Sequence, residues 1–315
     1  FRSKRDAELT KTLYDSAPVL ISEMEDENPW GVSFLRMFDM SNDSDLFRSR
    51  KELEGNGCML RGNAFECEEA TYSPLYEAKM IGLWDHRASR IVINESAVKR
   101  QGQPEDFSTQ EHQQADEVPT PRHWVEAKDV QDTIPENRDR SWFQGFANVT
   151  SPTNHRTMIT TVIPEAGVGH SMPLILADPQ LGSPVRSSLL ANFCSFVFDY
   201  ASRQKLGGIN FTFYNLKQLP VHPPGRYTLS LLEYIVPRVL ELTYTAWDLA
   251  AFADDVWSEA DGALLSAVES QWQSNVRITD GGHRGATPPE WVEHSDQADE
   301  EFLAALVLVG DHEQP

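Results

Sequence analysis

"DYASRQKLGGINFTFYNLKQLP", residues 199–220, joins a helix pattern to a strand pattern. Just before and within it, apolar side chains recur at helical spacing and predict one helix with a continuously buried face, made of Leu190, Phe193, Cys194, Val197, Phe198 and Ala201. Arg203 and Lys205 fall in the predicted last turn, where cations suit the negative helix end, and Gly207 can close it in a left-handed conformation. Apolar and polar residues then alternate over 209–214, which predicts a half-buried strand with one polar face.

Charge makes this stretch unusual, because 48 acidic residues outweigh 27 basic ones and the formal net charge is -21. Such a balance is typical of a highly soluble surface, of a protein from a very salty cytoplasm or, in a weaker form, of a Lys-poor, GC-rich genome. It argues against nonspecific nucleic-acid binding by the chain as a whole, since phosphate contacts need positive potential. A DNA-binding face would therefore be a local basic patch on an acidic body.

Size and composition indicate a globular protein, with 315 residues of which 40% are hydrophobic. The longest apolar runs are far shorter than the roughly 20 residues that cross a bilayer, and no signal-peptide pattern opens the chain, so we expect no membrane partner and a cytoplasmic protein. Cys58, Cys67 and Cys194 have no CxxC spacing, which favours reduced, packed thiols over disulfides or a zinc site. The chain begins at Phe1 without a Met, which we interpret as a fragment or a processed product.

The order of patterns predicts an α+β fold, with a small mixed or antiparallel sheet, flanking helices and a mainly helical C-terminal part. We expect a helical N-terminal segment over 1–57, an α+β domain over 58–222 and a helical region over 223–315. Within these, helices are predicted in 6–25, 41–54, 229–257 with a kink or break at Pro237, 261–273 and 300–310. Strands are predicted in 70–95 and, as a pair, in 142–163, whereas 100–120 reads as a mobile surface loop.

No catalytic motif is visible in the chain. It contains no HExxH, GxxxxGK[ST] or GxSxG motif, and no GxGxxG between a strand and a helix. Its nine histidines are dispersed. We therefore predict no catalytic residue and no metal ligand here.

Four stretches together resemble the C-terminal part of large fused N6-adenine DNA methyltransferases, of the type IIG restriction-modification and bacteriophage-exclusion (BREX, PglX-like) kind. The four stretches are NPWGVSFLRMFDMSNDSDLF (28–47), PLYEAKMIGLWDHR (74–87), WFQGFANVTSPTNHRTMITTVIP (142–164) and LLANFCSFVFDYASRQKLGGINFTFYNLKQLPV (189–221). The order and approximate spacing of these stretches also match the family, and the resemblance covers roughly residues 1–255. In that family the region follows the catalytic domain and resembles a target recognition domain, which holds the duplex and reads the methylation site. The resemblance implies two partners, double-stranded DNA and the methyltransferase catalytic domain of the same parent protein.

The resemblance also implies that the parent enzyme transfers a methyl group from S-adenosylmethionine to a flipped adenine, in restriction-modification or phage defence. The cofactor-binding turn and the [ND]PP[YF] loop of the catalytic domain are missing here, since HPPG (222–225) and TPPEW (287–291) lack the flanking residues. We therefore expect no cofactor in this chain. The family's GFR-type motif stands as Gly145, Phe146 and Ala147, without its Arg, and the last 60 or so residues depart from the family.

Three groups of residues are candidates for DNA binding: Gln204, Lys205, Gly208 and Asn210; Asn154 and Arg156, beside His155; and Lys79 and Arg87, beside Asp85 and His86. Each group also has a purely structural interpretation. The first is equally a capped core helix running into an edge strand, the second an exposed loop, and the third a buried Asp-Arg pair. Trp142 and Phe146 are expected in the core. If the DNA hypothesis holds, a basic strip should run through Lys79, Arg87, Arg156 and Lys205.

Two other classes of function compete with DNA recognition. An acidic protein-protein module, or a DNA mimic, is supported by the net charge but should string carboxylates along one face and gives no reason for RQKLGG beside NFTFY. A self-contained hydrolase would need a cluster of pKa-shifted carboxylates in a pocket.

Overall fold

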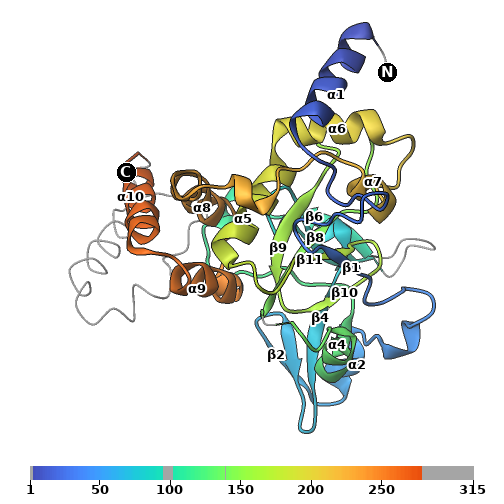
Figure 1. Cartoon of the computed structure of the whole chain (residues 1–315). Helices are drawn as coiled ribbons and strands as arrows, with labels where there is room; N and C mark the ends of the chain where they lie inside the picture. The colour runs from blue at the N-terminus through green and yellow to red at the C-terminus, as the bar shows by residue number, and fades with distance from the viewer. Residues whose placement is uncertain (1–2, 95–101, 139, 279–315) are drawn as a thin grey trace.

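The computed structural model describes residues 3–94, 102–138 and 140–278 and confirms the α+β class (Figure 1). Its central sheet is antiparallel and has the order β1(Ser33–Leu35), β11(Leu174–Leu176), β8(Trp142–Phe146), β9(Thr160–Pro164). The predicted strand pair in 142–163 is confirmed by β8 and β9, in which Gly145 lies opposite Thr161. All five residues of β8 are buried, including Trp142 and Phe146, so this strand is the middle of the core.

A second, mixed sheet is built around β4(Thr71–Tyr76). β4 pairs with β3(Ala64–Glu66) and β7(Trp124–Glu126) antiparallel and with β10(Gly167–Val168) parallel, and β3 pairs with β2(Met59–Arg61). A separate hairpin joins β5(Ser89–Ile93) to β6(Gly102–Asp106). Strands predicted in 70–95 are thus confirmed, as β4 and β5. The prediction of a mobile loop over 100–120 is wrong for its described part, because β6 and the short helix α3(Thr109–His112), capped by Ser108, occupy it.

Helices cover the central sheet and extend the core on one side. In Figure 1, α8(Leu229–Thr243), α9(Ala250–Ser258) and α10(Gly262–Ile278) gather beside the sheet, α1(Lys4–Ser16), α6(Phe196–Lys205) and α7(Phe213–Lys217) lie at one end, and α2(Arg50–Gly55) and α4(Ala127–Thr133) lie at the other. Single 3-10 turns are η1(Ser44–Leu46), η2(Ala78–Met80), η3(Pro224–Arg226) and η4(Trp247–Leu249). One apolar cluster joins Trp142 and Val162 of the sheet to α5(Ser183–Cys194), α8, α9 and α10, so it crosses the predicted boundary at 222–223.

The predicted helix through 190–201 is in fact two helices. Ser195 takes an extended conformation between α5 and α6, and its hydroxyl caps α6 by accepting from the N–H of Phe198 at 3.1 Å. Because the axis changes there, Val197 is 58% exposed instead of buried. The expected left-handed Gly207 is also wrong, since α6 ends through an extended Leu206.

The strand predicted after α6 and a break at Pro237 are not found, and one predicted helix lies outside the described residues. Residues 209–214 form only a single bridge, between Asn210 and Val149, before α7 begins. A strand cannot continue because Thr212 starts α7, with its N–H and hydroxyl both donating to Asn215 Oδ1 at 2.9 Å. Helix α8 is not broken at Pro237, which lies inside it. The helix predicted over 300–310 falls outside the described residues.

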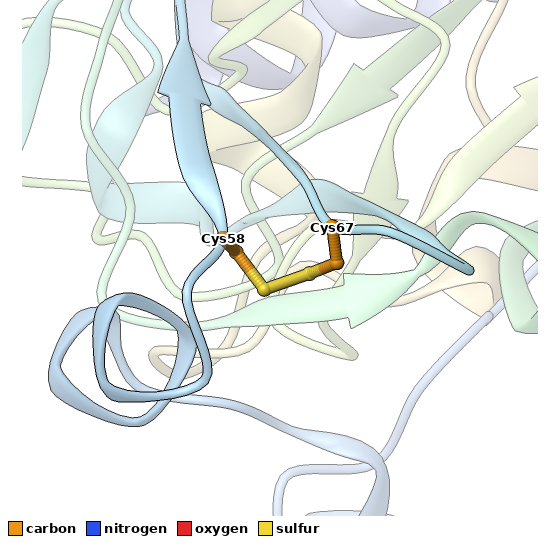
Figure 2. The surroundings of a disulfide bond; sticks show 2 residues. All are labelled: Cys58 and Cys67. Atoms are coloured by element: carbon orange, nitrogen blue, oxygen red, sulfur yellow. A yellow bond between two sulfur atoms is a disulfide. The ribbon is translucent and has the colours of Figure 1, made fainter.

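Cys58 and Cys67 form a disulfide, which corrects the prediction of three reduced thiols (Figure 2). The hairpin register explains the pairing. Met59 lies opposite Glu66, so the residues just outside them, Cys58 and Cys67, are also opposite each other, with their Cα atoms 4.3 Å apart. Their backbone N–H groups donate elsewhere, to Leu53 and Ala70, as in a non-hydrogen-bonded cross-strand pair where side chains are closest. Cys194 is free and buried.

Arg87 is fully buried and ties three segments together. Its guanidinium donates to the carbonyls of His112, Gln114 and Glu117 and to the hydroxyl and carbonyl of Thr245. Burial lowers the pKa of Arg87, against the opposing charges of Asp85 and Asp248. The β5–β6 hairpin is thereby fixed both to the segment after α3 and to the loop before η4.

Replacing Arg87 with Met should lower the free energy of unfolding by at least about 3 kcal/mol, because several buried carbonyls would lose their donor. Arg50→Met is the matched control, since Arg50 makes only an exposed pair with Glu54 on α2 and should cost about 0.5 kcal/mol or less. Urea unfolding followed by circular dichroism measures both. Equal unfolding midpoints for the two variants would contradict this role of Arg87.

The disulfide predicts a specific labelling pattern. In denaturant without reductant, a thiol reagent should label only Cys194, and after reduction it should label all three cysteines, as counted by mass spectrometry. Replacing both Cys58 and Cys67 with Ser should lower the free energy of unfolding by about 2–3 kcal/mol, the usual value for a bridge closing a short loop. Three labelled cysteines in the unreduced chain would show that the bridge does not form.

Candidate nucleic-acid interface

Two loops from distant parts of the sequence lie side by side. The N–H of Thr150 donates to the carbonyl of Ile209 at 2.9 Å, and the N–H of Phe211 donates to that of Asn148 at 2.7 Å. These bonds join the loop between β8 and β9 to the segment between α6 and α7. We call residues 148–156 and 207–214 together the two-loop surface.

The two-loop surface exposes amide and apolar side chains. Val149 is 58%, Ile209 64% and Tyr214 72% exposed. Asn154 and Asn210, two of the predicted site residues, are exposed beside them. Such a mixture of apolar groups and amides is suited to a partner that offers both hydrogen bonds and apolar edges.

Gly207 and Gly208 are exposed, and the protein itself does not require glycine there. Neither has a positive φ, and a Cβ on either would meet open space. A partner could therefore approach the backbone here without meeting a side chain of these two residues.

Arg36 extends the two-loop surface and was missed from sequence. Its exposed guanidinium lies 5.2 Å from the ring centre of Phe213, which stacks on Phe34 at 4.4 Å. The stretch SFLR (33–36) lies inside one of the four stretches that carry the family resemblance, but only the fold brings it next to 213.

The loop 151–157 is held from behind by a carboxylate and a guanidinium on α6. Asp199, 5% exposed, accepts through Oδ1 from the N–H groups of Thr157 and Met158, at 2.6 and 3.0 Å. Its Oδ2 accepts from Arg203 Nε at 2.8 Å. Arg203 also donates to the backbone carbonyls of Pro152, Asn154 and His155. One of the two basic residues predicted at the helix end therefore holds this loop.

The structure brings six of the eight predicted site residues to this end of the molecule. Asn154, Gly208 and Asn210 belong to the two-loop surface, with Arg156 at its edge, where the guanidinium stacks 4.0 Å from the ring of Phe196. Gln204 and Lys205 follow on the last turn of α6, and Lys205 Nζ donates to Gln218 Oε1 at 2.5 Å. Near Arg156, burial raises the pKa of the Cys194 thiol well above its ordinary value, although the Arg charge opposes it.

Lys79 and Arg87 are placed elsewhere. Lys79 donates to the carbonyl of Gly102 at 3.1 Å and pairs with Glu77 at 3.2 Å, so it serves η2 and the β5–β6 hairpin. Arg87 is 0% exposed. The predicted basic strip through both residues therefore does not form, because its second member lies inside the protein.

Charge is reversed in the part of the chain that builds this surface. Residues 143–232 contain only three acidic residues, Glu165, Asp178 and Asp199, against six basic ones, Arg156, Arg186, Arg203, Lys205, Lys217 and Arg226. Asp199 is buried against Arg203 and backbone N–H groups. A count along the sequence would have found this segment, but averaging over the chain hides it.

Carboxylate pKa shifts and possible metal ligands bear on the other functions considered. The carboxyl groups of Glu23, Asp39, Glu52 and Asp85 each have a pKa below its ordinary value. At Asp85, burial opposes the shift, and bonds from His112 and the Arg87 N–H together with the charge of His86 outweigh it. No group of three potential metal ligands and no helix able to span a membrane occurs among the described residues.

Comparisons with known proteins find structural neighbours, one of which is an HsdS subunit. No protein-family model matches the chain, and no curated protein matches it. The crystal structure of the HsdS subunit from Thermoanaerobacter tengcongensis aligns over 90% of this chain and 51% of its own, at 14% identity and a TM-score of 0.27. The chain thus spans about half the length of that protein, and so low a TM-score does not establish a shared fold.

Asp199→Asn should loosen the loop 151–157, most of which belongs to the two-loop surface. Asn has one acceptor oxygen where Asp has two, so either Arg203 Nε or the N–H groups of Thr157 and Met158 lose their acceptor and face an amide NH2 group. We therefore expect the free energy of unfolding to fall by about 2 kcal/mol. Hydrogen exchange at Thr157 and Met158 should accelerate with it. The control Asp132→Asn, exposed on α4, should change stability by no more than about 0.5 kcal/mol. Unchanged exchange at both amides would contradict the assignment.

Proposed function

We propose that this chain is the DNA target recognition part of an S-adenosylmethionine-dependent adenine-N6 DNA methyltransferase, and that it binds double-stranded DNA through the two-loop surface. The observation that carries the proposal is the local charge reversal over 143–232 in a chain of net charge -21. Phosphate contacts require positive potential, and this segment carries more basic than acidic residues where amide side chains and backbone are exposed.

The composition of the surface fits a duplex. Arg36 and Lys205 carry the positive charge, and Gly207 and Gly208 let a phosphate or a groove wall approach the backbone. The exposed side-chain amides of Asn154 and Asn210 each offer a donor and an acceptor, which suits hydrogen bonding to base edges in the major groove. The methyltransferase catalytic domain of the parent protein, with its S-adenosylmethionine, is implied by the family resemblance and belongs to this proposal as the partner that acts on the adenine.

An acidic interaction module is less favoured by the same observation. A DNA mimic would present carboxylates along its exposed face, whereas the exposed loops here contain none.

Fluorescence anisotropy with a labelled random-sequence duplex, titrated over salt, tests the proposal. We expect saturable binding whose log K falls with log salt with a slope of several units. Arg36→Ala and Lys205→Ala should each weaken binding and reduce the slope by about 0.9, the value for one lost phosphate contact.

Lys128→Ala is the control. Lys128 is exposed on α4, and this substitution removes one positive charge away from the two loops. Its slope should equal that of the unaltered chain. A folded chain that binds no duplex at any salt concentration, or an equal loss with Lys128→Ala, would refute DNA binding by this surface.

A further inference from the structure

The turn Ser151–Arg156 has its backbone turned inward, toward α6. Three of its carbonyls, those of Pro152, Asn154 and His155, accept from the single guanidinium of Arg203. A fourth, that of Ser151, accepts from the Asn154 N–H at 3.1 Å and from the Thr157 hydroxyl at 3.3 Å. Because the carbonyls point at the protein, the side chains of Thr153, Asn154 and His155 are left exposed.

Only an arginine can hold the turn in this way. Its planar fork donates in fixed directions to the Asp199 carboxylate and to three carbonyls at once, whereas a lysine ammonium has three donors at one point. The anchor is itself rigid, since Asp199 is 5% exposed and is fixed by two backbone N–H groups. Arg203 is therefore committed to the turn and is not available as a phosphate contact.

Asn154 is the side chain that this arrangement presents. Its amide carries one acceptor and two donors, the set that makes a bidentate contact to N6 and N7 of adenine in the major groove. Such a contact discriminates between bases only if the residue that carries the side-chain amide is held in place. The backbone carbonyl of Asn154 accepts from Arg203 Nη2 at 2.7 Å, which fixes the backbone from which the side chain projects.

We propose that Asn154 is a specificity-determining residue that reads an adenine, and that Arg203 is the positioning residue that orients it. This inference rests on the proposed function and deepens it. It separates two roles in the basic end of α6: Lys205 contributes affinity for any duplex, and Arg203 contributes the choice among duplexes.

The test begins with selection of a preferred duplex from a random library by the full chain. The ratio of Kd for a scrambled duplex to Kd for the selected one is then measured at fixed salt. For Arg203→Lys we expect this ratio to fall roughly ten-fold, while Kd for the scrambled duplex stays within about two-fold because the charge is kept. Hydrogen exchange at Thr157 and Met158 should accelerate. Arg226→Lys, an exposed Arg of η3, is the matched control and should change neither value.

Asn154→Ala keeps the test decisive if Arg203→Lys folds poorly, because Asn154 is exposed and its side chain takes no part in the bonds of Arg203. It should lower the ratio by a similar factor and leave the exchange of Thr157 and Met158 unchanged. A selected duplex with 7-deazaadenine at its adenines lacks the N7 acceptor, so it should weaken binding by the unaltered chain and have no effect on binding by Asn154→Ala.

The outcomes separate this inference from the proposed function. A chain that binds no duplex refutes both. A chain that binds every duplex equally, or an Arg203→Lys variant with an unchanged ratio, refutes the inference and leaves DNA binding standing. Equal losses for selected and scrambled duplexes would make Arg203 merely structural or a phosphate contact, and would also refute it.

Discussion

The fold depends on a guanidinium that never reaches solvent. Burying Arg87 is costly unless all its donors are satisfied, and the chain satisfies them with main-chain carbonyls after α3 and with Thr245 before η4. A side chain from one hairpin thus dictates where two otherwise irregular segments must lie. The helical region is in this way fastened to the sheets by hydrogen bonds, in addition to the apolar cluster around Trp142.

The same device recurs at the two-loop surface. Asp199 and Arg203 fix the loop 151–157 through its backbone, just as Arg87 fixes 112–117. In an acidic protein, basic residues used in this way are removed from the surface potential. Fewer positive charges are therefore free at the surface than a count of Arg and Lys suggests, and the proposed DNA contacts depend on residues such as Arg36 and Lys205.

Local patterns predicted the class of fold, the β8–β9 pair and the buried Trp142 and Phe146, because alternation and burial are encoded by neighbouring residues. Long-range partners were not predictable in the same way. The residues around Arg87 in sequence do not indicate that it binds Thr245, and those around Arg36 do not indicate that it packs on Phe213. Two signals were present but overlooked: Ser195 as a helix cap between two helices, and the cysteines four positions either side of the Gly62–Asn63 turn, which hairpin register places opposite each other.

The inward-facing backbone of the 151–156 turn has a consequence for how such a surface diversifies. Its conformation is set by main-chain carbonyls and by two residues on α6, so the outward side chains of Asn154 and His155 carry little of the folding energy. Under the proposed DNA-binding role, the residues that hold the turn differ from those that would contact bases. New sequence preferences would then arise by exchanging these two exposed side chains, without the rest of the protein having to adapt.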